Sequence, residues 1–440
     1  MEAIAEEVKV AKYPAYKVSG VEWLGEIPAH WQTLANKYIF NLKKRPVGKN
    51  SSDFVLLSLT LNGVIKRDME NPQGKFPSEF NTYQEVDKGD FIFCLFDVEE
   101  TPRTVGLSKH NGMITGAYTV MQPNDNFDRG FLYYFYLNLD AGKRLKSLYT
   151  GLRNTISKEN FFSFKTFVPP KEEQTAIADF LDRKTAQIDK AIGIKEKQIE
   201  LLNERRQILI HNAVTRGLNP DVPMKDSGVE WIGEIPAHWE VKRVKHLGRI
   251  INGYAFNSGE FKSEGVRVMK ISNIQTMRVD WADESFIDEK YYNKLTQFRV
   301  NQDDLAFALT RPIISTGIKA AIVSTNEKVL LNQRNAVLRP TEKVGNRWLY
   351  YIILDSEFVQ TFDNEIDKTG QQPNISTVSI GNLRIPFTSL KEQKVIVKYL
   401  DEVTSKVSIT ISLKEKEIEK LKEYKASLIN SAVTGTIKVC

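Results

Sequence analysis

The sequence predicts an α+β protein with two mixed α/β globules, related by pseudo-two-fold symmetry and separated by a long antiparallel two-helix coiled coil. Three observations predict this fold class. A segment of thirteen residues occurs twice, short apolar runs alternate with turn residues after each copy, and each half ends in a long stretch without proline. A chain of 440 residues is too long for one core, and an internal repeat implies a repeated architecture.

The repeated segment reads SGVEWLGEIPAHW at residues 19–31 and SGVEWIGEIPAHW at residues 227–239, with Leu24 and Ile232 as the only difference. We call each copy the tag. Its large apolar side chains surround a turn that contains proline, which indicates a packed structural element. His30 and His238 lie inside the tags, and a lone histidine beside tryptophan is more often hydrogen-bonded within the packing than catalytic.

Shorter matches continue through both halves. VDKGDFIF from Val86 matches VNQDDLAF from Val300, and TGLRNTIS from Thr150 matches TGQQPNIS from Thr369. The separation grows from 208 positions (227 − 19) to 219 (369 − 150), so the second half carries a few short insertions. The ends of the two halves are nearly constant, whereas their middles have diverged.

The middle of each half is predicted to be a mixed α/β globule of about 130–150 residues, a common domain size. Apolar runs, many of them β-branched or aromatic, predict strands at 54–61, 90–96 and 113–121 and again at 266–272, 304–310 and 320–325. Helical patterns follow at 129–148 and 347–366.

The closing segments carry an apolar stripe with heptad spacing. The stripe consists of Ile188, Ile192, Ile199, Leu202 and Leu209 in the first segment and of Val407, Ile411, Ile418, Leu421 and Leu428 in the second. Residues 172–218 and 391–439 contain no proline, so each segment is predicted to be one long helix, with or without a short lead-in helix.

Each stripe must be covered, and the other helix is the obvious cover. Because the first helix reaches the second tag through a short linker, and globule termini usually lie close together, the pair is predicted to be antiparallel with the C-terminus returning near the N-terminus. Charged residues interrupt the stripe at Lys195, Arg206, Lys414 and Lys425, where they are expected to fix the helix register.

In chain order, the predicted parts are an N-terminal segment at 1–18, a first globule at 19–168, a central helical region at 169–217, a linker at 218–226, a second globule at 227–387 and a C-terminal helical region at 388–440.

Composition favours a cytoplasmic protein. The net charge of +6 and pI of 8.9 lean weakly towards a polyanionic partner. Two cysteines, Cys94 and Cys440, form neither a disulfide framework nor a zinc site, and no apolar run is long enough to span a membrane. The residues 1–12 are too acidic and too broken for a signal peptide.

The sequence contains no motif for catalysis. Phosphate-binding loops, H-E-x-x-H, C-x-x-C and G-x-S-x-G are all absent. Asp97, Glu99 and Glu100 form the densest carboxylate cluster of the first globule, and a solvated loop is the better interpretation. This pattern favours a binding protein over an enzyme.

The tag, the TG…IS motif, the KEQ-type helix start and the long K-E-K-x-I-E helix, each present twice, resemble the specificity subunits of type I restriction-modification enzymes. The resemblance covers nearly the whole chain. It implies that each globule is a target-recognition domain that reads one half of a bipartite, asymmetric target in double-stranded DNA. It also implies that the helices set the spacing and dock two modification (methyltransferase) subunits.

By the same resemblance, the chain is non-catalytic and binds no cofactor or metal. S-adenosylmethionine, ATP and Mg are expected on partner subunits, including restriction subunits with ATPase and nuclease activity. The helical rod of about 30 residues would span roughly 45 Å, or about 13 bp, so both globules could enter major grooves on about the same DNA face.

Arg, Lys, Asn and Gln read base edges and hold phosphates, so these residue types beside predicted strands are the candidate DNA contacts. In the first globule they are Lys43, Lys44, Arg45, Arg67, Arg103, Lys109, Arg153 and Asn154. In the second globule they are Asn273, Arg311, Asn332, Gln333, Arg334, Gln371 and Gln372. The stretches LTRP from Leu309 and NQRN from Asn332 are the strongest candidates, because their polar residues adjoin apolar strands.

Two alternatives remain. A scaffold that holds two copies of a partner without reading DNA would also need paired helices, but it has no use for unlike middles. A nuclease or transferase with an unrecognised site is disfavoured by the absence of motifs.

Overall fold

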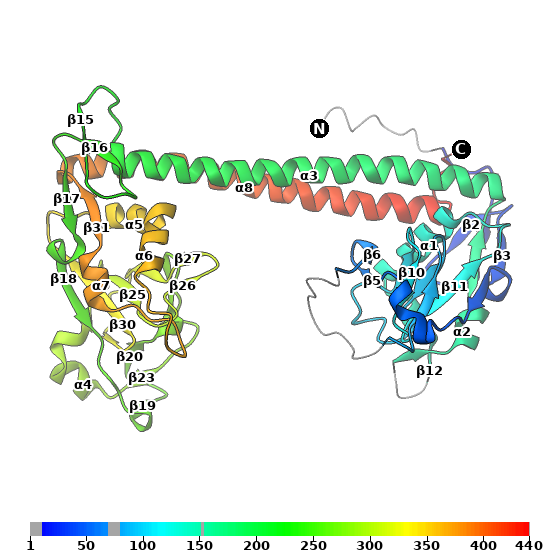
Figure 1. Ribbon diagram of the computed structural model, residues 1–440, viewed down its shortest axis with the longest axis horizontal. Coiled ribbons are helices and arrows are strands. Elements are labelled where there is room, and N and C mark those ends of the chain that lie inside the picture. The colour runs from blue at the N-terminus through cyan, green and yellow to red at the C-terminus, as the bar shows by residue number, and fades with distance from the viewer. Residues whose placement is uncertain (1–10, 69–79, 151–153, 440) are drawn as a thin grey trace. The chain divides into compact units, whose positions relative to one another are not determined.

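The computed structural model describes residues 11–68, 80–150 and 154–439 (Figure 1). The chain divides into two compact units, unit 1 (Met1–Lys195 and Glu415–Cys440) and unit 2 (Glu196–Lys414). Each unit contains a mixed α/β globule and parts of two long helices, which confirms the predicted fold class. No helix among these residues is long and apolar enough to cross a membrane.

Unit 1 is built on an antiparallel sheet of four strands in the order β4 (Phe40–Lys43), β11 (Thr119–Pro123), β8 (Phe91–Phe93) and β9 (Val105–Leu107). Helix α1 (Arg129–Ala141) packs on this sheet. The core is aromatic, since the ring of Phe93 lies 5.2 Å from that of Tyr136 and 4.7 Å from that of Phe161.

Two further strand pairs frame this globule. Strand β1 (Tyr16–Val18) pairs with β2 (Glu26–Pro28), and β3 (Gln32–Ala35) pairs with β14 (Lys165–Val168). The other elements of unit 1 are η1 (Asn36–Tyr38), η2 (Gly48–Asp53), β5 (Leu57–Thr60), β6 (Gly63–Lys66), β7 (Gln84–Val86), β10 (Gly112–Ile114), η3 (Arg144–Leu148), β12 (Tyr149–Thr150), β13 (Thr155–Ile156) and α2 (Lys158–Ser163).

Unit 2 repeats this frame strand for strand. Its four-stranded sheet has the order β18 (Gly248–Asn252), β30 (Asn335–Pro340), β25 (Leu305–Ala308) and β28 (Ala320–Ile322), which are the counterparts of β4, β11, β8 and β9. The framing pairs also recur, as β15 (Met224–Asp226) with β16 (Glu234–Pro236) and β17 (Glu240–Arg243) with β31 (Arg384–Phe387). The sequence repeat therefore encodes one topology used twice.

The insertions distinguish the two units. Unit 2 has a second, five-stranded sheet in the order β19 (Phe261–Lys262), β23 (Phe286–Ile287), β20 (Val266–Met269), β29 (Val329–Leu331) and β24 (Arg299–Val300). Its remaining elements are η4 (Val244–His246), η5 (Ser258–Glu260), η6 (Ile271–Asn273), β21 (Ile274–Gln275), β22 (Arg278–Val279), α4 (Glu289–Lys294), η7 (Thr296–Phe298), β26 (Ile313–Ile314), β27 (Gly317–Ile318), α5 (Asn346–Leu354), α6 (Ser356–Asn364) and α7 (Thr377–Asn382). In unit 1 the corresponding region contains the pairs β5–β6 and β7–β10.

The tag joins its globule to the start of a long helix. Trp31 is fully buried, and its indole N–H donates to Oε1 of Glu173 at 3.0 Å. His30 contacts the other oxygen of the same carboxylate at 2.7 Å, and in unit 2 His238 contacts Glu392 at 3.0 Å. Both histidines are thus hydrogen-bonded, as predicted, but they are about half-exposed and lie at the surface of the tag, not inside its packing.

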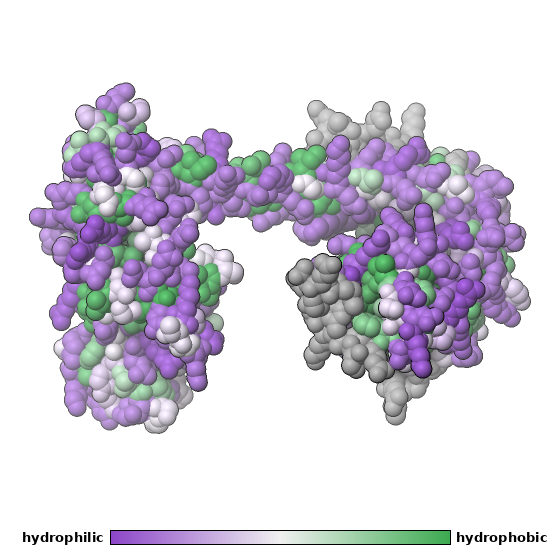
Figure 2. Space-filling model, in the orientation of Figure 1, coloured by the Kyte–Doolittle hydropathy of each residue, from purple (hydrophilic) through white to green (hydrophobic). Residues whose placement is uncertain are grey.

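The two long helices are α3 (Lys171–Arg216) and α8 (Leu390–Val433). Within unit 1 they run antiparallel, because Lys195 of α3 pairs with Glu417 of α8, whereas Asp189 lies 2.6 Å from Lys425. The predicted register positions Lys195 and Lys425 therefore form ion pairs across the helices. Figure 2 shows separate hydrophobic patches along the surface of the helices. Among the apolar side chains of α3, Leu201 and Ile208 are half-exposed.

The heptad stripe is the covered side of each helix. Ile188, Ile418 and Leu428 are buried, and the other predicted stripe residues, Ile192, Ile199, Leu202, Leu209, Val407, Ile411 and Leu421, are half-buried. Within unit 2, the end of α3 shares a core with Ile396 and Leu400 near the start of α8.

The chain returns to its beginning in unit 1. The backbone N–H of Lys438 donates to the carbonyl of Ala11 at 2.8 Å, and the Tyr16 hydroxyl donates to the carbonyl of Gly435 at 3.2 Å. The prediction that the C-terminus lies near the N-terminal segment is confirmed.

Several predicted strands are shorter in the structure, such as β8 and β28, and three predicted elements differ more strongly. Residues 113–121 form parts of two strands, because a turn closed by the hydrogen bond from Tyr118 N to Thr115 O separates them. The helix predicted at 129–148 ends at Ala141, and Lys143 adopts a left-handed conformation. The helix predicted at 347–366 is broken at Asp355, whose carboxylate caps α6.

Candidate nucleic-acid interface

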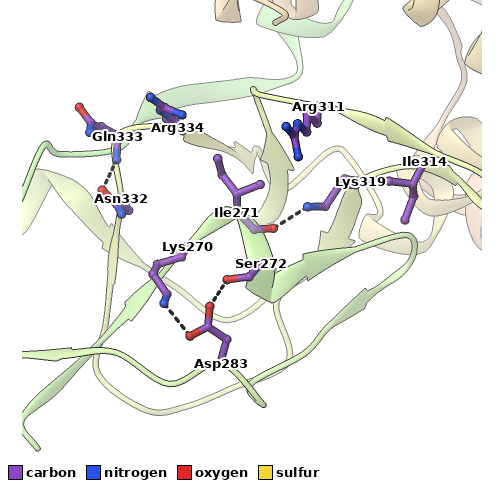
Figure 3. Close-up of a pocket in the computed structure, with 10 residues that line it drawn as sticks. All are labelled: Lys270, Ile271, Ser272, Asp283, Arg311, Ile314, Lys319, Asn332, Gln333 and Arg334. Carbon is purple, nitrogen blue, oxygen red and sulfur yellow. Dashed lines mark hydrogen bonds and ion pairs between the residues drawn. The ribbon is translucent and has the colours of Figure 1, made fainter. Parts of the chain in front are cut away.

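The strongest candidate surface lies in unit 2, where two open hollows adjoin. The first, which we call the Arg311 hollow, has a volume of about 650 Å³ and is lined by Lys270, Ile271, Ser272, Asp283, Arg311, Ile314, Lys319, Asn332, Gln333 and Arg334 (Figure 3). The second, the Gln371 hollow, measures about 620 Å³ and shares Gln333 and Arg334 with the first. Its lining also includes Gln371 and Gln372. Six of the seven residues predicted in this globule therefore come together.

Three separate segments bring these side chains together. Arg311 follows β25, the turn Asn332–Arg334 connects β29 with β30, and the two glutamines precede α7. The backbone of Gly253 approaches the turn so closely that a Cβ atom on it would lie 1.9 Å from the carbonyl oxygen of Asn332. Only glycine fits this position, because a side chain there would clash with the backbone of the turn.

The turn Asn332–Arg334 is anchored by the residue that follows it. Asn335 is fully buried and donates from Nδ2 to the carbonyl of Met269 at 2.8 Å. Its own carbonyl accepts from Gly253 N at 3.0 Å. Gln333 and Arg334 are exposed while their flanking backbone is held, which suits side chains that bind a rigid ligand.

The Arg311 hollow is lined by two lysines that already have partners and by two arginines whose side chains have none among the described residues. Lys270 lies 2.6 Å from Asp283, and the pKa of that carboxyl is lowered by hydrogen bonds from Lys270 and Ser272. Lys319 is buried, donates to the carbonyl of Ile271 at 2.7 Å, and has its pKa lowered by burial. The guanidinium groups of Arg311 and Arg334 make no hydrogen bond or ion pair with the described residues, so their donors are available.

Asn273, the remaining candidate of unit 2, is not on this surface. It is fully buried, donates from Nδ2 to the carbonyls of Asp280 and Asp283, and accepts from Lys270 N. The prediction that Asn273 contacts DNA fails for this reason, since its amide is satisfied inside the fold.

Lys43 of unit 1 is also turned inward. Its side chain is 7% exposed, and its Nζ lies 2.6 Å from Asp87 and 2.7 Å from Asp90. Burial opposes the charge, but the hydrogen bonds to both carboxylates outweigh it and raise the pKa of Lys43. This ammonium group stabilises the globule and is not available to a phosphate.

The other candidates of unit 1 lie in several loops. Arg103 is partly engaged, because it donates to the carbonyl of Leu61 at 2.9 Å and lies 3.8 Å from Asp140. Arg67 is half-buried after β6, whereas Lys44, Arg45, Lys109 and Asn154 are exposed. Arg153 lies outside the described residues.

Sequence reasoning missed Lys270 and Lys319, which line the Arg311 hollow. Each is a single lysine next to a strand or a short helix, and no local pattern separates such a lysine from an ordinary surface residue. Among residues 11–68, 80–150 and 154–439, no cluster of His, Cys, Asp or Glu could hold a metal ion.

Comparisons with known proteins agree on one family. Residues 110–204 and 236–423 match the family described as Type I restriction modification DNA specificity domain. The type I restriction enzyme MjaVIII specificity subunit of Methanocaldococcus jannaschii is 32% identical over 72% of both chains. The putative type I restriction enzyme MjaX specificity subunit of the same organism is 23% identical over 94% of this chain and 96% of its own length.

Solved structures share the fold. A chain from a study of complex assembly and conformational transition of the type I R-M system matches 92% of this chain and 98% of its own length with a TM-score of 0.69 and 15% identity. The HsdS subunit from Thermoanaerobacter tengcongensis matches 93% of this chain and 98% of its own, with a TM-score of 0.53 and 16% identity. On the sequence matches, this chain belongs to the family of type I restriction-modification specificity subunits.

Proposed function

We propose that this chain selects the DNA sequence for a type I restriction-modification complex, and that each globule reads one half of a bipartite, asymmetric target in the major groove. The observation that carries the proposal is one strand frame, built twice, with unlike insertions and unlike polar residues. A scaffold for two identical partners would not need this divergence, whereas two different half-sites require it.

The chemistry of the Arg311 hollow suits base readout. Arginine forks onto the O6 and N7 atoms of guanine, and glutamine onto N6 and N7 of adenine. Arg311, Gln333 and Arg334 offer these groups on exposed turns, with Lys270 and Lys319 adding positive charge at the same hollow. Exposed cations such as Lys44, Arg45 and Lys109 of unit 1 are candidates for phosphate contacts that hold the register.

The helices supply the second part of the proposal. We expect them to set the spacing between half-sites and to dock two methyltransferase subunits. The half-exposed Leu201 and Ile208, seven residues apart on α3, support docking by further helices, because this spacing presents apolar side chains on one helix face.

On this proposal the chain has no catalytic role of its own. S-adenosylmethionine, ATP and Mg belong to the methyltransferase and restriction subunits, and the complex acts in the cytoplasm on double-stranded DNA. The net charge of only +6 fits a subunit that relies on its partners to neutralise phosphates.

A domain exchange tests this function. Residues 32–150 are replaced by the equivalent region of a relative, and the chain is expressed with its modification subunits. Sequencing of methylated genomic DNA should then show that one half of the methylated sequence changes and the other half stays. A change in both halves, or in neither, would contradict modular reading, and methylation without sequence preference would favour the scaffold.

A further inference from the structure

Two charged residues occupy the same unusual backbone position in the two units. Asp97 has a φ of 43° and Arg311 a φ of 48°, in the left-handed region that glycine adopts readily, asparagine and aspartate adopt at times, and arginine seldom adopts. They are equivalent in sequence, because each lies eleven positions after the first residue of the matching segments VDKGDFIF, from Val86, and VNQDDLAF, from Val300. Each follows the central strand β8 or β25 of its sheet.

The same contacts hold both residues. The backbone N–H of Asp97 donates to the carbonyl of Asn154 at 2.7 Å, and that of Arg311 donates to the carbonyl of Pro373 at 2.8 Å. The residue before each forms an antiparallel bridge, Phe96 with Thr155 and Thr310 with Asn374. The anchoring residues belong to the repeated TG…IS motifs, so this motif has a physical task, which is to fix the left-handed residue.

The side chains at this position carry opposite charges, negative for Asp97 and positive for Arg311. Asp97 and Arg311 are both exposed, and neither side chain makes a hydrogen bond or an ion pair with the described residues. A position that served only the turn would be less strained with glycine. The long charged side chain of Arg311 therefore indicates that this side chain itself has a role, and at the equivalent position the exposed carboxylate of Asp97 is available to a ligand.

The surroundings of Arg311 indicate what that role is. Arg311 lies in the hollow that also contains Gln333 and Arg334, and Figure 3 shows Arg311 and Arg334 on one side of it with the Lys270–Asp283 pair on the other. Arginine recognises guanine through O6 and N7, and aspartate accepts from the N4 amino group of cytosine. A rigid backbone with an exchangeable side chain is what a reading position requires.

We propose that the left-handed residue after the central strand is a specificity-determining position in each unit, where Arg311 selects a guanine in one half-site and Asp97 selects a cytosine in the other. This inference rests on the proposed function, because it assumes that the two units read two half-sites. It adds which residue reads, and which base class each unit prefers there.

Three substitutions test the proposal in the full chain, expressed with its modification subunits in cells that lack other adenine and cytosine methylation. Arg311→Lys keeps the charge for a phosphate contact but loses the fork. Arg311→Asn and Asp97→Asn keep a residue that tolerates the left-handed backbone. Arg249→Ala and Asp125→Asn, two exposed residues elsewhere, are the matched controls.

Sequencing of methylated genomic DNA gives the result. Both Arg311 variants should relax one guanine position in a single half-site, with discrimination reduced roughly 5- to 150-fold, and Asp97→Asn should relax one cytosine position in the other half-site. The controls should keep the parental motif. Melting temperatures of the purified complexes show that the variants are folded.

Two results would overturn the inference. One is an unchanged methylated motif in all three variants. The proposed function would still stand in that case if the exchange of residues 32–150 changes the sequence of one half-site. The other is loss of methylation at all sites at an unchanged melting temperature, since that would assign these residues a role independent of sequence. Relaxation of both half-sites by one variant would contradict the proposed function as well.

Discussion

Replacing Lys43 by alanine should destabilise unit 1, because this ammonium group compensates a buried carboxylate. Its Nζ lies 2.6 Å from Asp87 and 2.7 Å from Asp90, whose side chain is 2% exposed. Removing one partner of a buried ion pair leaves an uncompensated charge, at a cost of about 3–5 kcal/mol in the free energy of unfolding. In a unit of this size each kcal/mol lowers Tm by about 2–4 °C, so Tm should fall by roughly 6–20 °C.

Differential scanning calorimetry of the full chain measures this change, and Lys44→Ala is the matched control. Lys44 is the next residue on the chain, is exposed, and has no hydrogen-bond partner among the described residues, so its removal should change the free energy of unfolding by no more than about 0.5 kcal/mol. Equal melting temperatures for the two variants would refute the internal role of Lys43. Loss of DNA binding by Lys43→Ala at an unchanged Tm would restore the hypothesis that it contacts DNA.

Three further perturbations follow from the contacts. The hydrogen bond to Asp355 raises the pKa of His211 against the effect of burial. The pair therefore stabilises unit 2 fully below a pH of about 6.5, and this stabilisation is lost as pH rises through the raised pKa. The Tm difference between the wild type and His211→Gln should shrink from pH 5.5 to pH 9, and a constant difference would contradict this. Glu173→Ala leaves the buried indole N–H of the first tag without an acceptor and should lower the free energy of unfolding by about 1–3 kcal/mol in urea titrations, whereas an unchanged midpoint would refute the anchoring role. Deleting one heptad from each helix, residues 198–204 and 409–415, should shorten the spacer of the methylated sequence by about 3 bp without altering either half-site, and an unchanged spacer would exclude the helices as its determinant.

The duplicated frame explains why constant and variable parts alternate along this chain. The strand pairs that frame each globule and the TG…IS segment build the same contacts in both units, and the tag histidine of each unit contacts the glutamate near the start of a long helix. The insertions between them differ, since unit 2 has a five-stranded sheet where unit 1 has two small strand pairs. A side chain at a proposed reading position can therefore change without disturbing the frame that holds it.

The candidate site was predictable where polar residues follow an apolar strand directly. LTRP and NQRN met this condition, and the structure places Arg311 and the turn Asn332–Arg334 around one hollow. Asn273 met it as well, but a fold with several turns per globule also needs buried amides to satisfy backbone carbonyls, and Asn273 performs that task. Residue type and strand proximity do not distinguish the two uses.

The sequence by itself determined the duplication and the two long helices, because heptad spacing and a repeated tag are local patterns that need no knowledge of distant contacts. The antiparallel direction of the helices followed from the short linker to the second tag, whereas their register came from the structure. Only the tertiary structure decided which of two neighbouring lysines is buried and which residues meet at a hollow. Lys43 and Lys44 are neighbours at the end of β4, where successive side chains point to opposite faces of the sheet. The carboxylates that pair with Lys43 lie more than forty positions away in the sequence. The left-handed geometry shared by Asp97 and Arg311 likewise depends on contacts with a segment far along the chain, which composition does not reveal.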